Sequence, residues 1–246
     1  IETSFRHITQ EEKYMMWLDE LLQREPTQIT KWWMDEFDWL LWWLYEGRIY
    51  LVWAETWVWK STFVNQVANN VASTGKRVVK YSLEDRMEDK AQEDIFYAIN
   101  KKRNKDWKWL LDPIIFTNWW YNKTSRFLDE CVEAKENLSR LPIIELKRDK
   151  TITPSELVEL IKIEADNWTK LFIIDHLHFL DFKWDNESRI DQQIADTMQQ
   201  LNMVVTSRNI TILLVAHYKV WVSKQWEPSY DRFRWSSAIK QTVNII

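Results

Sequence analysis

Three consecutive residues, Lys60, Ser61 and Thr62, carry side chains of the kind that bind phosphate groups. They follow a β-branched and aliphatic run at 49–52 and a short turn, and they precede apolar residues that recur at helical spacing over 63–71. In a phosphate-binding loop, backbone N–H groups at a helix N-terminus hold phosphate oxygens, the lysine reaches the β- and γ-phosphates, and the first hydroxyl ligates Mg²⁺. The stretch therefore predicts a strand, a phosphate loop and a helix.

Tryptophan stands in this loop where glycine is needed. The expected nucleotide-binding residues are Ala54, Glu55, Thr56, Trp57, Val58, Trp59, Lys60, Ser61 and Thr62. Glycine lets the chain enter conformations that are costly for a residue with a Cβ, and it lets phosphate touch the backbone. An indole at Trp59 would fill the place of the phosphate. The motif is thus a coincidence, or the site is inactive, or the working protein does not carry these tryptophans.

The composition bears on this choice. The 246 residues include 2 Gly and 18 Trp, whereas a glycine content of about 7% would give roughly 17 glycines. Tryptophans also form doublets, such as Trp32-Trp33, and occupy polar turns, as at Trp168 and Trp184, where glycine is favoured for its positive φ. We interpret them as glycine positions whose UGA codons the source organism decodes as glycine. The alternative is a genuinely tryptophan-rich, catalytically inactive chain.

The remaining composition restricts the class of protein. A hydrophobic content of 46% over 246 residues is enough for one α/β domain, or for a domain with an appended segment. One cysteine, Cys131, excludes an internal disulfide, and there is no apolar run of membrane-spanning length and no signal peptide. A net charge of −4 argues against a globally basic nucleic-acid-binding coat and leaves open a local basic channel in an assembly. We expect a soluble cytoplasmic protein, cut at both ends.

A glutamate ends the second predicted strand, at 77–84. Ligand chemistry in α/β proteins lies outside the carboxyl ends of strands, so Glu84 is a candidate for the base that polarises an attacking water. An equally good interpretation is an acidic residue that caps the helix predicted to follow at about 86–101.

Two further predicted strands end in residues that suit a nucleotide site. Asp175 follows an apolar run, and its carboxylate would ligate Mg²⁺ directly or through water. His217 ends the strand predicted at 211–217 and suits a sensor of the γ-phosphate, or else caps the strand at the surface. His176 and His178 are more typical of packing than of zinc binding, because no cysteine or third histidine converges with them.

The rest of the chain alternates between helical and strand patterns. A helical pattern spans 14–22, and 101–125 is polar and predicts a surface loop. Further helices are predicted at 125–139, 154–167 and 188–207, and a strand at 143–146.

The order of these motifs resembles the RecA-like motor domain of DnaB-type hexameric replicative helicases, including phage and mitochondrial relatives. The resemblance rests on the phosphate loop, the strands ending Ser-Leu-Glu, Asp-His-Leu-His and Ala-His, and above all on Arg-Phe-Arg-Trp-Ser-Ser-Ala-Ile-Lys-Gln at 232–241. It implies an α/β fold with a RecA-like phosphate-loop NTPase core, in which helices flank a mostly parallel central sheet. Residues 1–29 would be an N-terminal helical segment or linker, and 30–246 the ATPase domain, truncated at its C-terminus.

The resemblance also implies roles for residues. Glu84 would be the catalytic base and His217 the γ-phosphate sensor, with Ser61 and Asp175 at the Mg²⁺. Single-stranded DNA would contact the chain at Arg234, Trp235 and Ser237.

ATP and Mg²⁺ would be the substrate and metal of this motor, and its partners would be single-stranded DNA, five further copies in a hexamer, and a primase or helicase loader. It would act in the cytoplasm, or in the host cytoplasm if phage-encoded. The arginine finger that such hexamers supply in trans would lie beyond Ile246. The remaining alternatives are another RecA-like ATPase, of recombination or regulation, which the motif at 232–241 disfavours, and a tryptophan-rich binding or scaffold protein.

Overall fold

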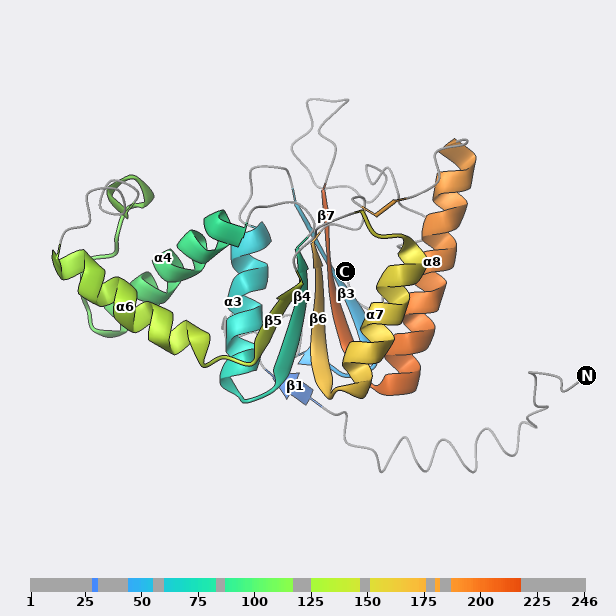
Figure 1. The fold of residues 1–246 in the computed structure, drawn as a ribbon, viewed down its shortest axis with the longest axis horizontal. Helices are drawn as coiled ribbons and strands as arrows, with labels where there is room; N and C mark the ends of the chain where they lie inside the picture. The colour runs from blue at the N-terminus through green and yellow to red at the C-terminus, as the bar shows by residue number, and fades with distance from the viewer. Residues whose placement is uncertain are drawn as a thin grey trace, which may run out of the picture.

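A five-stranded parallel sheet forms the centre of the molecule (Figure 1). The structure, a computed structural model, describes residues 28–30, 44–54, 60–82, 87–116, 125–146, 151–175, 180–181 and 187–217. The strands of the sheet are β3 (Arg48–Ala54), β4 (Arg77–Ser82), β5 (Ile143–Leu146), β6 (Thr169–Asp175) and β7 (Thr211–His217). Their order is β3-β7-β6-β4-β5, and every neighbouring pair is parallel. Two short strands, β1 (Gln28–Thr30) and β2 (Leu44–Tyr45), pair antiparallel beside it.

Helices cover both faces of the sheet. In Figure 1, α3 (Lys60–Ser73) lies on one face, and α7 (Pro154–Asp166) and α8 (Glu187–Arg208) lie on the other. Outside α3, α4 (Met87–Lys105) and α6 (Ser125–Ser139) form a helical pair that extends away from the sheet. This is the α/β architecture with a mostly parallel sheet that the sequence predicts.

Alternation along the strands explains why both faces are apolar. Successive side chains of a strand point to opposite faces. In β6, Leu171 and Ile173 pack on the side of α3, whereas Phe172 and Ile174 pack on the side of α7 and α8. All four are buried, as expected for a parallel strand that is covered on both sides.

A smaller apolar cluster holds α4 and α6 together. Its buried members are Ile99, Leu111, Phe116, Phe127 and Ala134. The rings of Phe116 and Phe127 meet edge to face at a centroid distance of 5.4 Å. The pair of helices therefore has its own core, separate from the two clusters on the sheet.

The helix α7 begins at Pro154, as predicted, and side chains cap its first turn. Thr153 is the N-cap, Pro154 opens the helix, and Glu156 completes a capping box. The backbone N–H of Glu156 donates to Thr153 Oγ1 at 3.2 Å, and the backbone N–H of Thr153 donates to Glu156 Oε2 at 2.7 Å. Two N–H groups that the helix leaves without partners are thereby satisfied.

The predicted loop at 101–125 is wrong in part. The helix α4 continues to Lys105, and 113–116 form a further helical turn. The charged residues at the end of α4 meet charges of opposite sign on α6, with Lys102 bonded to Glu133 and Arg103 to Glu130. The helical pattern expected at 14–22 lies outside the described residues, and strand structure is present from Gln28.

Among the described helices, none is both long and apolar enough to cross a membrane.

Candidate nucleotide-binding site

Parallel pairing aligns the carboxyl ends of four strands at one edge of the sheet, the upper edge in Figure 1. Ala54, the last residue of β3, is in register with His217, the last residue of β7. Ser82, the last residue of β4, is in register with Asp175, the last residue of β6. Because α/β proteins bind ligands outside this edge, the sequence-predicted Asp175 and His217 end their strands where a ligand site is expected.

The helix α3 begins at the same edge. Lys60, Ser61 and Thr62 are its first three residues, and the helix runs back along the sheet from the strand ends (Figure 1). Backbone N–H groups in the first turn of a helix have no intrahelical partner and favour anions. The first turn of α3 carries no acidic residue that would repel an anion. The backbone therefore suits phosphate at this point.

Apolar packing fixes the direction of α3. Val64, Val67, Ala68 and Val71 are almost fully buried, at the spacing of one helix face. They share a cluster with side chains of the strands below, Tyr50, Leu171, Ile173, Leu213 and Val215. The N-terminus of α3 is thereby held rigidly against the strand ends, as a site on a rigid scaffold requires.

Asp175 is a buried carboxylate, with 5% of the residue exposed. Aspartate is seldom buried unless its charge is paired, hydrogen-bonded or bound to a cation. Within the described ranges, no three His, Cys, Asp or Glu side chains gather as a metal site. A single aspartate at a strand end suits Mg²⁺, which takes one or two protein ligands together with phosphate oxygens and water.

A buried polar network anchors β4 beside Asp175, and sequence reasoning missed it. Ser82 Oγ donates to Glu145 Oε1 at 2.6 Å, and Lys80 Nζ lies 3.5 Å from Glu145 Oε2. Lys80 and Ser82 are both buried. The signal was present, because Lys80 and Glu145 each interrupt an apolar strand, and they are direct partners in the β4–β5 register. The network fixes the end of the strand from which Glu84 follows.

The other predicted site residues have no described side chains. The side chains of Lys60, Ser61, Thr62 and His217 are not described, although their backbone is. Residues outside the described ranges are Glu55, Thr56, Trp57, Val58, Trp59, Glu84, Arg234, Trp235 and Ser237. The roles given to these residues stay predictions.

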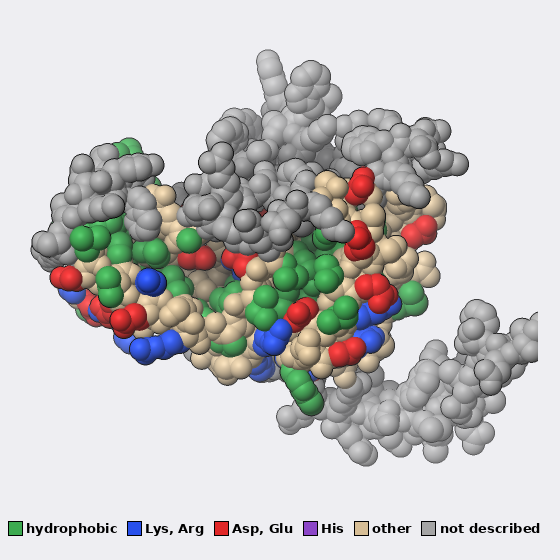
Figure 2. Space-filling model, viewed as in Figure 1, with side chains coloured by type: hydrophobic (Ala, Val, Ile, Leu, Met, Phe, Trp, Pro, Cys, Tyr) green, Lys and Arg blue, Asp and Glu red, His purple; other side chains and the backbone are tan. Residues whose placement is uncertain are grey.

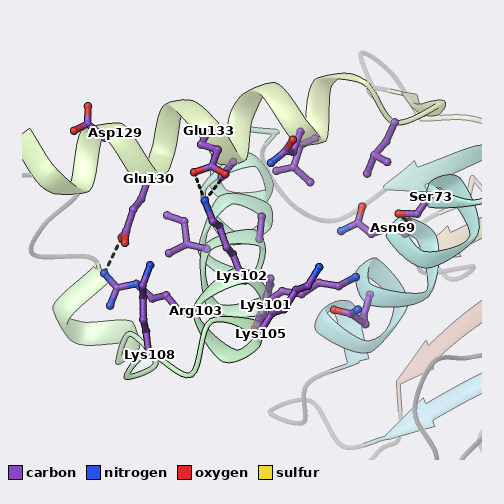
Figure 3. Close-up of a pocket in the computed structure, with 18 residues that line it drawn as sticks. Asn69, Ser73, Lys101, Lys102, Arg103, Lys105, Lys108, Asp129, Glu130 and Glu133 are labelled. Carbon is purple, nitrogen blue, oxygen red and sulfur yellow. Dashed lines mark hydrogen bonds and ion pairs between the residues drawn. The ribbon is translucent and has the colours of Figure 1, made fainter.

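A cleft of about 460 Å³ lies on the outer side of α3, between it and the α4–α6 pair (Figure 3). Charged side chains cross it: Arg103 Nη2 lies 2.7 Å from Glu130 Oε2, and Lys102 bonds to Glu133. Lys101 Nζ donates to Asn70 Oδ1 of α3 at 3.1 Å, and burial lowers the pKa of this lysine. These contacts tie the helices together, so we interpret the cleft as a seam between helices and not as part of the phosphate site.

Acidic and basic side chains are interspersed over α6 on the face shown in Figure 2. The described part of that face has no large area of a single sign.

Comparison with known proteins identifies the fold. No protein-family model and no curated protein sequence matches the chain. Among solved structures, the chain is similar to one described as an ATPase domain, with a TM-score of 0.74 and 16% identity over 97% of this chain and 83% of the other. It is equally similar, at a TM-score of 0.74 and 16% identity, to a DnaB-like replicative helicase described with its interactions with primase. That match covers 98% of this chain and 56% of the helicase. The predicted resemblance to DnaB-like helicase ATPase domains is confirmed at the level of the fold.

Proposed function

We propose that this chain is the ATPase motor domain of a hexameric replicative DNA helicase, which couples ATP hydrolysis to translocation on single-stranded DNA. The observation that carries the proposal is the shared edge at which β3, β4, β6 and β7 end and α3 begins. Lysine and two hydroxyls at that helix start, with an aspartate and a histidine ending neighbouring strands, are the residue types that phosphoryl transfer from ATP requires. The DnaB-like fold supports the same assignment.

Each residue of the proposed nucleotide site has a distinct task. Lys60 binds the β- and γ-phosphates with the backbone of the loop at 54–62, and Thr62 adds a contact to phosphate. Glu84 orients the attacking water and accepts its proton, and His217 donates a hydrogen bond to the γ-phosphate. Ser61 and Asp175 hold Mg²⁺, which would neutralise charge on the phosphate oxygens. The buried position of Asp175 fits this task.

Single-stranded DNA contacts the segment at 234–237 in this proposal. Arg234 pairs with a DNA phosphate, and the backbone at Trp235 and Ser237 donates to phosphate oxygens. Such contacts release counterions, so the affinity falls steeply with salt. This segment follows β7 in the sequence, and β7 ends at His217, the proposed γ-phosphate sensor.

The assembly follows from the same assignment. Residues 30–246 form the ATPase domain and 1–29 an N-terminal segment or linker. Six copies surround the DNA strand with nucleotide between neighbours, and the motor works with a primase or a helicase loader. It acts in the cytoplasm, or in the host cytoplasm if a phage encodes it.

Coupling between nucleotide and DNA tests this function. The protein would be made with glycine at Trp53, Trp57 and Trp59, and its affinity for a fluorescent oligo-dT strand would be measured with and without a non-hydrolysable ATP analogue. We expect the analogue with Mg²⁺ to change the DNA affinity about tenfold, a coupling of about 1.4 kcal/mol. The variant Arg234→Ala should lose DNA affinity and keep nucleotide affinity.

The alternatives give different outcomes in this experiment. Nucleotide binding without any effect of DNA would favour another RecA-like ATPase over a translocating motor. Binding of neither ligand by a folded protein would leave the scaffold interpretation.

A further inference from the structure

Two tryptophans have a backbone conformation that L-amino acids rarely adopt. The φ angles of Trp107 and Trp168 are +55° and +66°. In this left-handed region the Cβ crowds the carbonyl oxygen that follows, and a large side chain there is an outlier. Glycine has no Cβ and enters the region freely.

Both tryptophans stand one residue beyond the C-cap of a helix. After α4, the backbone N–H of Trp107 donates to the carbonyl of Asn104 at 3.2 Å, and that of Lys108 donates to the carbonyl of Arg103 at 2.8 Å. This is the hydrogen-bond pair of a Schellman motif, whose left-handed residue is usually glycine. After α7, the backbone N–H of Trp168 donates to the carbonyl of Ala165 at 3.1 Å.

Two other helices of the chain end in the same way with the expected residues. After α3 the position belongs to Gly75, with a φ of +82° and an N–H that donates to Ala72 at 2.9 Å. After α8 it belongs to Asn209, with a φ of +48°. Glycine and asparagine are the residues that this position favours. Tryptophan therefore replaces the expected residue at two of these four helix ends.

Packing does not explain the two indoles. Trp107 is 97% exposed and Trp168 is 83% exposed. Trp109 is the other tryptophan whose side chain is described, and it is 93% exposed. Tryptophan is normally among the most buried side chains on average. Burial does not offset the backbone strain at Trp107 and Trp168.

We infer that the native protein carries glycine at Trp107 and Trp168, and that the same substitution applies to the tryptophans of the chain as a class. A UGA codon that the source decodes as glycine gives this pattern when it is translated as tryptophan. The two helix ends support this inference without reference to the phosphate loop, so it does not rest on the proposed function. It extends to Trp53, Trp57 and Trp59, where glycine would open the loop to phosphate.

Stability measurements on matched variants test the inference. Trp107→Gly and Trp168→Gly should each raise the folding equilibrium constant by about fivefold or more, because the left-handed conformation no longer carries a Cβ. Trp107→Ala and Trp168→Ala remove the indole but keep the Cβ, so they should recover little of this gain. Trp109→Gly is the control, since Trp109 is equally exposed and its φ is not positive. It should bring no gain.

Two results would overturn the inference from the variants. One is a loss of stability in both glycine variants, and the other is an equal gain from alanine and glycine. The substitution Gly75→Ala gives the reverse test, because the Cβ that it adds meets no atom within 4 Å. It should lower stability through conformation alone, and an unchanged stability would contradict the account.

Peptide mapping of the protein from its source cells decides the matter even if the variants fold poorly. Trypsin would release residues 163–170, which contain Trp168, as one peptide between Lys162 and Lys170. A mass with glycine at 168 is expected, and a mass with tryptophan would refute the inference. Glycine in this peptide together with no nucleotide binding would overturn the proposed function and leave the inference standing.

Discussion

Ser82 and Asp175 are paired in register at the carboxyl ends of β4 and β6, and both residues are buried. The pairing places the proposed metal carboxylate beside the strand that leads, two residues later, to Glu84. In a phosphoryl-transfer site the group that orients water must work close to the metal-bound phosphates. The register of the two strands therefore places the proposed metal carboxylate beside the strand end from which Glu84 follows in sequence.

Replacement of Asp175 by asparagine should weaken the binding of Mg-ATP. In the protein with glycine at Trp53, Trp57 and Trp59, Asp175→Asn removes the charge that holds Mg²⁺, and we expect a loss of about tenfold or more in the Mg²⁺-dependent part of the affinity. Titration of a fluorescent ATP analogue with and without Mg²⁺ measures this. Asp181→Asn is the control, because Asp181 is exposed. An unchanged Mg²⁺ dependence in a folded Asp175→Asn protein would remove Asp175 from the metal site.

Loss of the Glu145 carboxylate should destabilise the sheet. Glu145→Ala leaves the buried ammonium of Lys80 and the hydroxyl of Ser82 without the partner that each has now. We expect a loss of about 2–3 kcal/mol in the free energy of unfolding, measured by denaturation with urea.

The paired replacement is the control for that experiment. Lys80→Met with Glu145→Leu removes both charges, so it should recover most of the stability that Glu145→Ala loses. If Glu145→Ala is as stable as the parent protein, the network does not anchor β4.

Cys131 should react slowly with thiol reagents. Burial, and secondarily the charge of Glu130, raises the pKa of this thiol from 9.0 to about 11. Near pH 8 the thiolate fraction is then about 100-fold below that of an ordinary thiol, and the thiolate is the reactive form. Labelling by iodoacetamide should therefore be slower in the folded than in the unfolded protein by about that factor, and should accelerate about tenfold per pH unit up to about pH 11.

The same shift gives a pH dependence of stability. Because the folded protein holds the thiol proton more tightly, the contribution of Cys131 is fully present below pH 9 and is lost as pH rises from 9 to about 11. Equal labelling rates in the folded and unfolded protein would contradict both statements.

The sequence predicted the elements well because their signals are local. The strand β7 and the helix α6 have the predicted limits, since each combines a clear apolar period with punctuation at its ends. The helix α7 begins at the predicted residue, Pro154. Asp175 and His217 were predicted to end strands, and they do.

Features that depend on distant contacts were not predictable in the same way. The order of the strands and their register are set by packing between segments far apart in sequence. The end of α4 was predicted as a loop, because the ion pair between Arg103 and Glu130 forms only once α4 and α6 meet. The Lys80–Glu145 pair was not predicted, because the partner of a charged residue within an apolar strand can be identified only when the neighbouring strand is known.

The proposed function depends most on whether the loop before α3 binds nucleotide. The most direct measurement is the equilibrium binding of Mg-ATP to three proteins: the sequence as it stands, the protein with glycine at Trp53, Trp57 and Trp59, and that protein with Lys60→Ala. We predict that only the second binds well, and that the Lys60→Ala change weakens its affinity about 10- to 100-fold through lost charge-assisted contacts. Failure of the folded glycine protein to bind Mg-ATP, or binding that is unaffected by loss of Lys60, would contradict the assignment of this edge as a nucleotide site.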